Sequence, residues 1–162
     1  MKFTYMKTPL HRLTFSVVKI REWVEKECEG RTLNLFAGET KLNIAKEIRN
    51  DIRKEMPAQF HLEALEFVKK AIKSKVKFQT IILDPPYSYR KSMEMYDGAK
   101  ASSFNILKGY LPEILEKNGK VITFGYHSVC MGEKRGFFQE HLMVMYHGGA
   151  IHDTLVIVER RK

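Results

Sequence analysis

Helix-like and strand-like patterns of apolar residues alternate along the chain from about residue 15 to residue 125. Apolar spacings of three and four predict helices over Phe15–Cys28, Leu62–Ile72 and Phe104–Leu115. Short apolar runs predict strands over Thr32–Ala37, Thr80–Leu83 and Lys120–Gly125. Because such continuously apolar runs are typical of parallel strands covered on both faces, the alternation indicates an α/β fold with a mostly parallel sheet.

The last part of the chain has a different pattern. Two β-like segments, His141–Tyr146 and Thr154–Glu159, flank a turn with two glycines, which predicts an antiparallel hairpin. Upstream, the proline- and tyrosine-rich stretch Asp84–Ser103 is expected to be a loop. Pro112 is expected to kink the third helix or to start a new one, and Gly119 is expected to cap its end.

The length of 162 residues predicts a single domain, in which an N-terminal helical segment, residues 1–30, precedes a core, residues 31–162. No apolar run approaches the roughly 20 residues that span a bilayer, so membrane insertion is not expected. Two cysteines are too few for a disulfide framework, and no signal-peptide pattern is present. These features predict a cytoplasmic protein.

The charge balance suggests a polyanionic partner. Lys and Arg number 28 against 19 Asp and Glu, which gives a net charge of +9 and a pI near 9.5. A basic surface of this size attracts nucleic acid. The alternative is a solvated, lysine-rich surface of the kind found in heat-adapted proteins.

The most specific string in the sequence is Asp84-Pro85-Pro86-Tyr87, which directly follows a predicted buried strand. In open α/β sheets, ligands bind beyond the carboxyl ends of the strands. A carboxylate, two prolines that fix the backbone and an aromatic ring make a rigid edge of acceptors that suits a planar ring with an exocyclic amino group. The alternative is a proline-rich turn whose Tyr87 packs against the protein.

With this string, the sequence resembles the Rossmann-like, S-adenosylmethionine-dependent amino-methyltransferases, which methylate adenine N6, cytosine N4 or guanine N2 in nucleic acids. Their tetrapeptide Asp/Asn-Pro-Pro-Tyr/Phe/Trp is matched by residues 84–87, and the first half of their Phe-x-Gly-x-Gly cofactor loop by Phe36-Ala37-Gly38. The likeness covers roughly residues 8–159. It implies S-adenosylmethionine as cofactor and a Rossmann-like methyltransferase fold. Only 12 residues separate Gly38 from Asp51, so the first crossover is expected to be truncated.

The resemblance also implies roles for single residues. Phe36, Ala37 and Gly38 would wrap the methionine end of the cofactor, and Asp51 would hydrogen-bond its ribose. Glu63 would face its adenine, and Thr8 and Pro9 would support the methionine part. Two alternatives stay open, since Asp51 would also serve as a helix N-cap and Glu63 as a surface residue. Thr40 stands where the family has its second glycine.

At the substrate, the Asp84 carboxylate and the Pro85 carbonyl would accept the two amino protons as positive charge develops on nitrogen. Tyr87 would stack on the base, next to the rigid Pro86. The residues Tyr89, Arg90, Lys91 and Lys100 would contact phosphates and bases from a lid. The alternative for that segment is a solvated loop without a partner.

A metal site is not expected. The candidate ligands His127, Cys130, His147, His152 and Asp153 contain no pair with the spacing of zinc ligands.

The resulting hypothesis is methyl transfer to adenine N6 in DNA. Because the chain has no room for a separate target-recognition domain, the hypothesis also implies loose specificity, a partner subunit or homodimer, or an RNA target. Methylation of an RNA base is therefore the close alternative. A different class remains, a nucleic-acid-binding module whose altered glycine loop supports no turnover.

Overall fold

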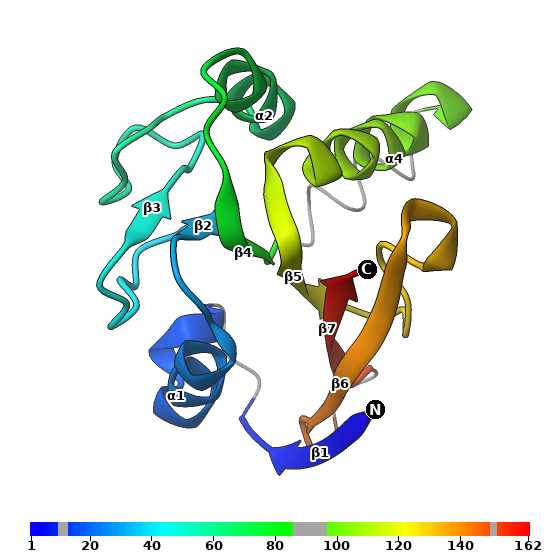
Figure 1. The fold of residues 1–162 in the computed structure, drawn as a ribbon. Helices are drawn as coiled ribbons and strands as arrows, with labels where there is room; N and C mark the ends of the chain where they lie inside the picture. The colour runs from blue at the N-terminus through cyan, green and yellow to red at the C-terminus, as the bar shows by residue number, and fades with distance from the viewer. Residues whose placement is uncertain (10–12, 86–96, 150–151) are drawn as a thin grey trace.

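The computed structural model describes residues 1–9, 13–85, 97–149 and 152–162, and for residues 97–103 the backbone only. Seven strands form one sheet in the order β1-β6-β7-β5-β4-β2-β3 (Figure 1). Their bounds are β1 Lys2–Lys7, β2 Thr32–Asn34, β3 Glu47–Arg49, β4 Phe78–Leu83, β5 Leu115–Gly125, β6 Phe137–Tyr146 and β7 Thr154–Arg161.

The sheet is mostly parallel, as the sequence predicted. β7 is antiparallel to both of its neighbours, β5 and β6, and the other described strand pairs are parallel. The C-terminal hairpin is thereby confirmed. From β2 the chain moves outward to β3 and then returns to the other side of β2 as β4. The strand order therefore reverses between β2 and β4, which is where open α/β sheets bind their ligands.

Helices cover both faces of the sheet. The helices are α1 Val18–Glu27, α2 Ala64–Lys73 and α4 Asp97–Ile114, with single 3₁₀ turns at Thr14–Ser16 and Glu133–Arg135. α1 lies on one face, and α2 and α4 lie on the other (Figure 1). Each face has its own apolar cluster: Ile20 and Val24 of α1 belong to one, and Phe67 of α2 and Leu111 of α4 belong to the other. The predicted helices and strands are thus confirmed as a layered core.

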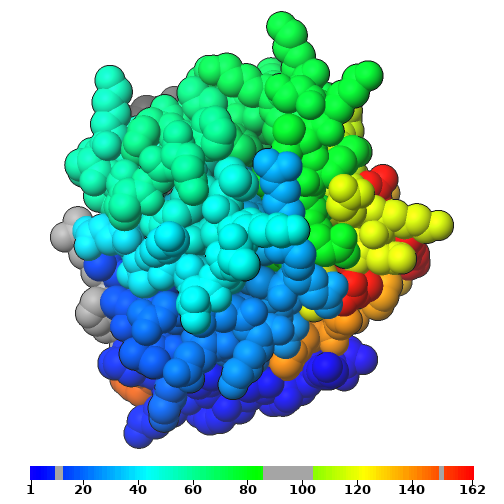
Figure 2. All heavy atoms as spheres, turned by 60° about the vertical axis from the view of Figure 1, so that its left-hand side comes forward, coloured from blue at the N-terminus to red at the C-terminus, as the bar shows by residue number. Residues whose placement is uncertain are grey.

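The truncated first crossover is also confirmed. Residues 35–46, all of which the structure describes, contain no helix between β2 and β3. Figure 2 shows that this segment and the one that follows β3 form a continuous surface between α1 and α2. The edge of the sheet at β3 is therefore covered by loops instead of a helix.

Several features differ from the prediction. The segment 1–30 contains α1, but it begins with β1, which the apolar pattern did not predict. α4 begins at Asp97, so the last part of the expected loop Asp84–Ser103 is helical. Those first residues of α4 are small or polar and give no apolar spacing. α4 continues through Pro112 to its end at Ile114, so no new helix starts at this proline.

The sequence predicted that Gly119 caps the end of the third helix, which is wrong. In the structure Gly119 lies within β5. A Cβ at this position would lie 2.7 Å from Cγ of Leu115 and 3.0 Å from the carbonyl oxygen of Gln79, so close packing requires a glycine here. The left-handed conformation expected of a capping glycine is instead found at Asn118, with φ of 60°.

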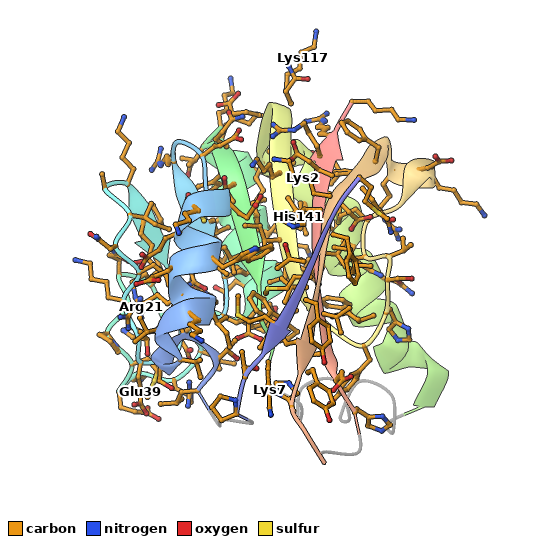
Figure 3. All side chains as sticks on the ribbon, turned by 90° about the horizontal axis from the view of Figure 1, so that it is seen from below. Lys2, Lys7, Arg21, Glu39, Lys117 and His141 are labelled. Atoms are coloured by element: carbon orange, nitrogen blue, oxygen red, sulfur yellow. The ribbon has the colours of Figure 1, made fainter. Side chains whose placement is uncertain are left out.

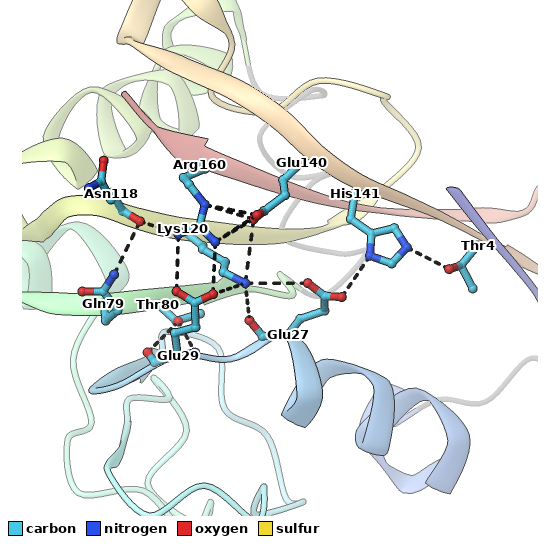
Figure 4. A network of polar contacts seen from close by, with 10 residues as sticks. All are labelled: Thr4, Glu27, Glu29, Gln79, Thr80, Asn118, Lys120, Glu140, His141 and Arg160. Carbon is cyan, nitrogen blue, oxygen red and sulfur yellow. Dashed lines mark hydrogen bonds and ion pairs between the residues drawn. The ribbon is translucent and has the colours of Figure 1, made fainter. Parts of the chain in front are cut away.

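At the amino edge of the sheet, a network of charges joins α1 to three strands (Figure 4). Lys120 is 5% exposed, and its ammonium lies 2.7 Å from a Glu29 oxygen and donates to the Glu27 carbonyl at 2.9 Å. Arg160 pairs with Glu29 at 3.0 Å and with Glu140 at 2.9 Å. The Arg160 guanidinium holds the pKa of Glu29 below its usual value. These groups satisfy one another, so the network serves the fold.

A second buried charge orders the connection between β5 and β6. Glu159 of β7 is fully buried, and its carboxylate accepts hydrogen bonds from the backbone N–H groups of Cys130, Met131 and Gly132 at 3.1, 2.7 and 2.8 Å. Three N–H donors solvate a buried carboxylate in place of water. Glu159 thus holds the start of this connection against the sheet.

Candidate active site

The three candidate site segments follow neighbouring strands that end at the same edge of the sheet. Asn34 of β2 is in register with Arg49 of β3 on one side and with Ile82 of β4 on the other. Phe36, Asp51 and Asp84 each follow two residues beyond these positions, at the carboxyl ends of three adjacent strands. Figure 3 shows Glu39 near the edge where β1 ends at Lys7, with Lys117 at the opposite edge. The candidate cofactor loop, its acid and the Asp84 motif therefore share the carboxyl edge.

The glycine turn after β2 has the conformation that its sequence requires. Gly38 has φ of +59°, in the left-handed region that favours glycine, and a Cβ built on it would meet no heavy atom of the described residues within 4 Å. The Ala37 N–H donates to the Asn50 carbonyl at 2.9 Å, and the Gly38 N–H donates to Asp51 Oδ2 at 2.8 Å. The structure thus brings Gly38 and Asp51 together beside open space.

A buried arginine holds the carbonyls of this turn. Arg49 is 2% exposed, and its Nη2 donates to the carbonyls of Ala37 and Gly38 at 3.3 and 2.8 Å. Nη1 donates to the Thr40 carbonyl at 2.7 Å, and Nε donates to the Pro57 carbonyl at 2.7 Å. The fork of guanidinium donors fixes several acceptors at once. Arg49 therefore fixes the backbone of this turn, which lacks the second glycine.

Glu47 completes this arrangement. Its carboxylate lies 3.4 Å from Arg49 Nη1, accepts from Asn34 Nδ2 at 3.2 Å and accepts from the Leu42 N–H at 3.3 Å. Sequence analysis missed both charged residues. A signal was present, because Glu47 and Arg49 stand two apart on a strand and therefore on the same face.

Asp51 follows β3 and is buried. It accepts from the Arg53 N–H at 3.0 Å and forms an ion pair with the Arg53 side chain at 3.1 Å. Burial alone would raise the pKa of Asp51, but the hydrogen bonds from Arg53 and Gly38 outweigh it and lower the pKa. The helix N-cap alternative is wrong, because the acceptor pattern is that of an Asx turn and no helix starts here.

Glu63 lies on the segment between β3 and α2 and is half-buried. It is the N-cap of α2, and its Oε2 accepts from the N–H groups of Leu65 and Glu66 at 2.9 and 3.2 Å. A carboxylate at this position stabilises the exposed N–H groups of the first turn. The structure therefore gives Glu63 a capping role, beside which its role toward adenine stays a prediction.

Asp84 is half-buried and Pro85 is buried, directly after β4. The other motif and lid residues lie outside the described residues, namely Pro86, Tyr87, Tyr89, Arg90 and Lys91. The backbone of Lys100 belongs to α4, and its side chain is outside the described part. The interactions of these residues with a base stay predictions.

Thr8 directly follows β1 at the far side of the sheet and is buried. Its N–H donates to the Tyr146 carbonyl at 3.0 Å, and its hydroxyl lies 3.3 Å from His147 Nδ1. Pro9 follows it and is exposed. In the strand order, β1 and β2 are separated by four strands. The support of a cofactor by Thr8 and Pro9 stays a prediction.

The described residues give little support to a metal site, a membrane-spanning helix or a cysteine nucleophile. No cluster of three or more His, Cys, Asp or Glu that could hold a metal ion occurs in that part of the chain. No described helix is long and apolar enough to cross a membrane. Burial raises the pKa of the Cys28 thiol to about 12, so this cysteine is protonated near neutral pH and is a poor nucleophile.

Comparison with solved structures identifies the fold. SMU.776, a proposed methyltransferase in complex with SAH, matches 88% of this chain and 48% of its own, with a TM-score of 0.62 and 15% identity. TrmN from Thermus thermophilus matches 94% of this chain and 50% of its own (TM-score 0.58, identity 16%). Magnesium protoporphyrin IX methyltransferase (ChlM) from Synechocystis PCC 6803 with bound SAM matches 92% and 79% (TM-score 0.58, identity 12%).

The chain therefore has the Rossmann-like fold of S-adenosylmethionine-dependent methyltransferases, as the sequence predicted. It spans about half the length of SMU.776 and of TrmN. No protein-family model matches the sequence, and no curated protein matches it.

Proposed function

We propose that this chain transfers a methyl group from S-adenosylmethionine to an exocyclic amino group of a nucleic-acid base, with adenine N6 in DNA as the favoured target. One observation carries the proposal: Phe36, Asp51 and Asp84 each lie two residues beyond paired positions of three adjacent strands, at the same edge of the sheet. A cofactor and a planar substrate bound there would meet at the reversal of strand order. The matched structures with SAH and SAM support the cofactor.

The residues present fit the cofactor. The open space beside Gly38 admits a ligand close to the backbone, which a side chain would prevent. Phe36, Ala37 and Gly38 would hold the methionine end, and Asp51 offers a carboxylate to the ribose hydroxyls. Arg53 lies on that carboxylate through a side chain that is 45% exposed, so it has room to shift. When bound, S-adenosylmethionine supplies an electrophilic methyl group.

The chain's own part in the reaction concerns the amino group. The nitrogen lone pair of such a group is delocalised into the ring, and positive charge develops on nitrogen as the pair localises. The Asp84 carboxylate and the Pro85 carbonyl would accept hydrogen bonds from its two N–H groups and stabilise that charge, and the carboxylate would take the one proton that the methylated nitrogen loses. Acceptors fixed in advance at a site of developing charge contribute about a hundredfold or more in rate. Tyr87, stacked on the base, would hold the ring in plane.

The net charge of +9 supports a nucleic-acid substrate. DNA and RNA carry the same phosphate charge, so the net charge does not distinguish them. Identification of the methylated nucleoside does. We favour DNA on the tetrapeptide, and methylation of an RNA base is the second candidate.

The cofactor is tested by thermal unfolding with and without saturating S-adenosylmethionine. Binding to the folded state raises the melting temperature by mass action, and Gly38→Val should abolish the shift. Gly136→Val is the matched control, because Gly136 also has positive φ, 80°, and no described heavy atom within 4 Å of a Cβ, but it lies just before β6. A wild-type protein without a shift or a calorimetric heat would refute the proposal.

Catalysis is tested by labelled methyl transfer to duplex DNA, single-stranded DNA and structured RNA, followed by mass spectrometry of the nucleosides. Asp84→Ala should lower transfer about a hundredfold or more while the thermal shift with cofactor persists. N6-methyladenine in DNA supports the favoured target, and methylated bases confined to RNA support the second candidate. A cofactor shift without transfer to any of the three would leave a binding module.

A further inference from the structure

One face of the sheet is only partly covered by helices. A single row of paired positions runs across that face from β1 to β4, through Phe3, Leu142, Ile157, Thr123 and Leu83. On β4 the row reaches the cluster beneath α2 and α4, to which Leu83 belongs. On β1 it ends in a side chain that is 64% exposed, Phe3. The outer strand β1 therefore presents this face to solvent, and the residues that β6 places on it are half-buried.

Aromatic rings line the uncovered part. Tyr5, two residues from Phe3 on the same face, is 60% exposed. Its ring stacks on that of Tyr146, at the end of β6, with centroids 6.0 Å apart and an interplanar angle of 22°. We call Phe3, Tyr5 and Tyr146 the aromatic strip. Its rings stand beside half-buried aliphatic side chains of β6, Leu142 and Val144.

The exposed charge that β1 and β6 carry on this face is positive. Lys7 is exposed and stands in register with Tyr146, on the same face as Tyr5. The carboxylate that β7 places on this face, Glu159, is fully buried and bound by three backbone N–H groups. The exposed positions of β1 and β6 on this face thus carry a lysine and no acid. The whole chain has a charge of +9.

We propose that the aromatic strip binds a single-stranded segment of nucleic acid next to the base that enters the active site. Aromatic rings on an open sheet stack on unpaired bases, whereas a duplex hides the faces of its bases. Lys7 would contact a phosphate. The inference that this segment belongs to a substrate rests on the proposed function.

The position of the strip agrees with this path. Phe3 stands in the same row as Leu83, the residue before Asp84. Four strand spacings, about 19 Å, separate β1 from β4. A strand of a few nucleotides extends over such a distance, so the strip and the candidate site would bind one molecule.

The test is fluorescence anisotropy of the full chain with a labelled oligonucleotide of mixed sequence, as single-stranded DNA, single-stranded RNA and duplex DNA. The double variant Phe3→Ala/Tyr5→Ala should weaken binding of both single strands at least tenfold, because each stacked base contributes about 5- to 160-fold. Tyr5→Phe keeps the ring and should bind nearly as the wild type does. Since both side chains are exposed, the melting temperature should change little, which thermal unfolding checks.

The matched control is Phe138→Ala. Phe138 also belongs to β6 and is 41% exposed, but it stands in register with Arg160, whose side chain lies in the charge network on the opposite face. Its loss should leave binding within twofold of the wild type. Unchanged single-strand binding in the double variant would overturn the proposal. So would sedimentation showing that the strip joins two copies of the chain and that the double variant merely separates them.

The strip and the proposed function fail in different ways. If the strip is correct and the chemistry is not, single strands bind through Phe3 and Tyr5 while no substrate receives a methyl group. If the chemistry is correct and the strip is not, the double variant methylates with an unchanged KM for the nucleic acid. If both are correct, the double variant has a raised KM and a nearly unchanged kcat.

Discussion

The buried pair of Arg49 and Glu47 offers a sharp test of how the glycine turn is held. In Arg49→Met, the Glu47 carboxylate stays buried without its cation, and the carbonyls of Ala37, Gly38 and Thr40 lose their donor. Removing one partner of a buried ion pair lowers the free energy of unfolding by about 3–5 kcal/mol. A domain is stable by only about 5–15 kcal/mol, so this loss is a large share of the total.

The measurement is urea unfolding followed by circular dichroism, with the free energy of unfolding extrapolated to water. Lys70→Met is the control, because Lys70 pairs with Glu66 at 2.9 Å with both side chains mostly exposed. Such a pair is worth about 0–1 kcal/mol. If Arg49→Met does not fold, Arg49→Lys replaces it, since lysine keeps the charge but lacks the fork of donors.

A double-mutant cycle then separates the ion pair from the carbonyl contacts. Glu47→Gln in the Arg49→Met background removes the uncompensated charge, so the double variant should be more stable than the sum of the two single losses predicts. The part of the loss that remains belongs to the unpaired carbonyls. A loss under about 1 kcal/mol in Arg49→Met, or simple additivity in the cycle, would refute the role given to the pair.

Three further predictions concern buried groups. The folded state lowers the pKa of Asp51. The stability that the Asp51 carboxylate contributes is therefore present above its unfolded pKa of about 3.9 and is lost as the pH falls through the folded pKa. Asp51→Asn should lower the melting temperature at pH 7, and the difference from the wild type should disappear in acid. Glu159→Ala should lower the free energy of unfolding by several kcal/mol, about 1–3 for each unpaired N–H, and hydrogen exchange should rise at residues 130–132. Cys28 should resist alkylation at pH 8 in the folded protein and react at once in denaturant, because its folded pKa is about 12.

The elements predicted best were those whose local pattern agrees with their burial. α2 and β4 have apolar residues at the spacing of their element, and both are buried as that spacing requires. β1 was missed although aromatic and polar residues alternate in it, because its aromatic side chains face solvent instead of a core. β3 was missed because buried charged residues flank its single isoleucine. The loops on either side of β3 supply the hydrogen-bond partners of Glu47 and Arg49, and no apolar pattern signals such a strand.

The candidate site follows the same division. The resemblance assigned Gly38 and Asp51 to the same cofactor, and the structure joins the two residues by a hydrogen bond of 2.8 Å. It did not predict that Glu63 caps α2, since a lone glutamate before a helix also fits a surface position. The arrangement of Arg53 on Asp51 joins residues two apart in the chain, but it depends on a turn that no pattern specifies.

The departure at Thr40 from the two-glycine pattern changes how the turn is held. A second glycine is useful where the backbone must take a positive φ, and among the described residues only Lys75 and Asn118 do so without being glycine. Thr40 therefore stands in an ordinary conformation, and its carbonyl, not its side chain, contributes to the turn through Arg49. Hydrogen bonds from the Arg49 side chain of β3 thus fix a turn that glycine conformations shape in the two-glycine loop. A motif search that requires both glycines would miss a turn built in this way, although Gly38 still leaves open space beside Asp51.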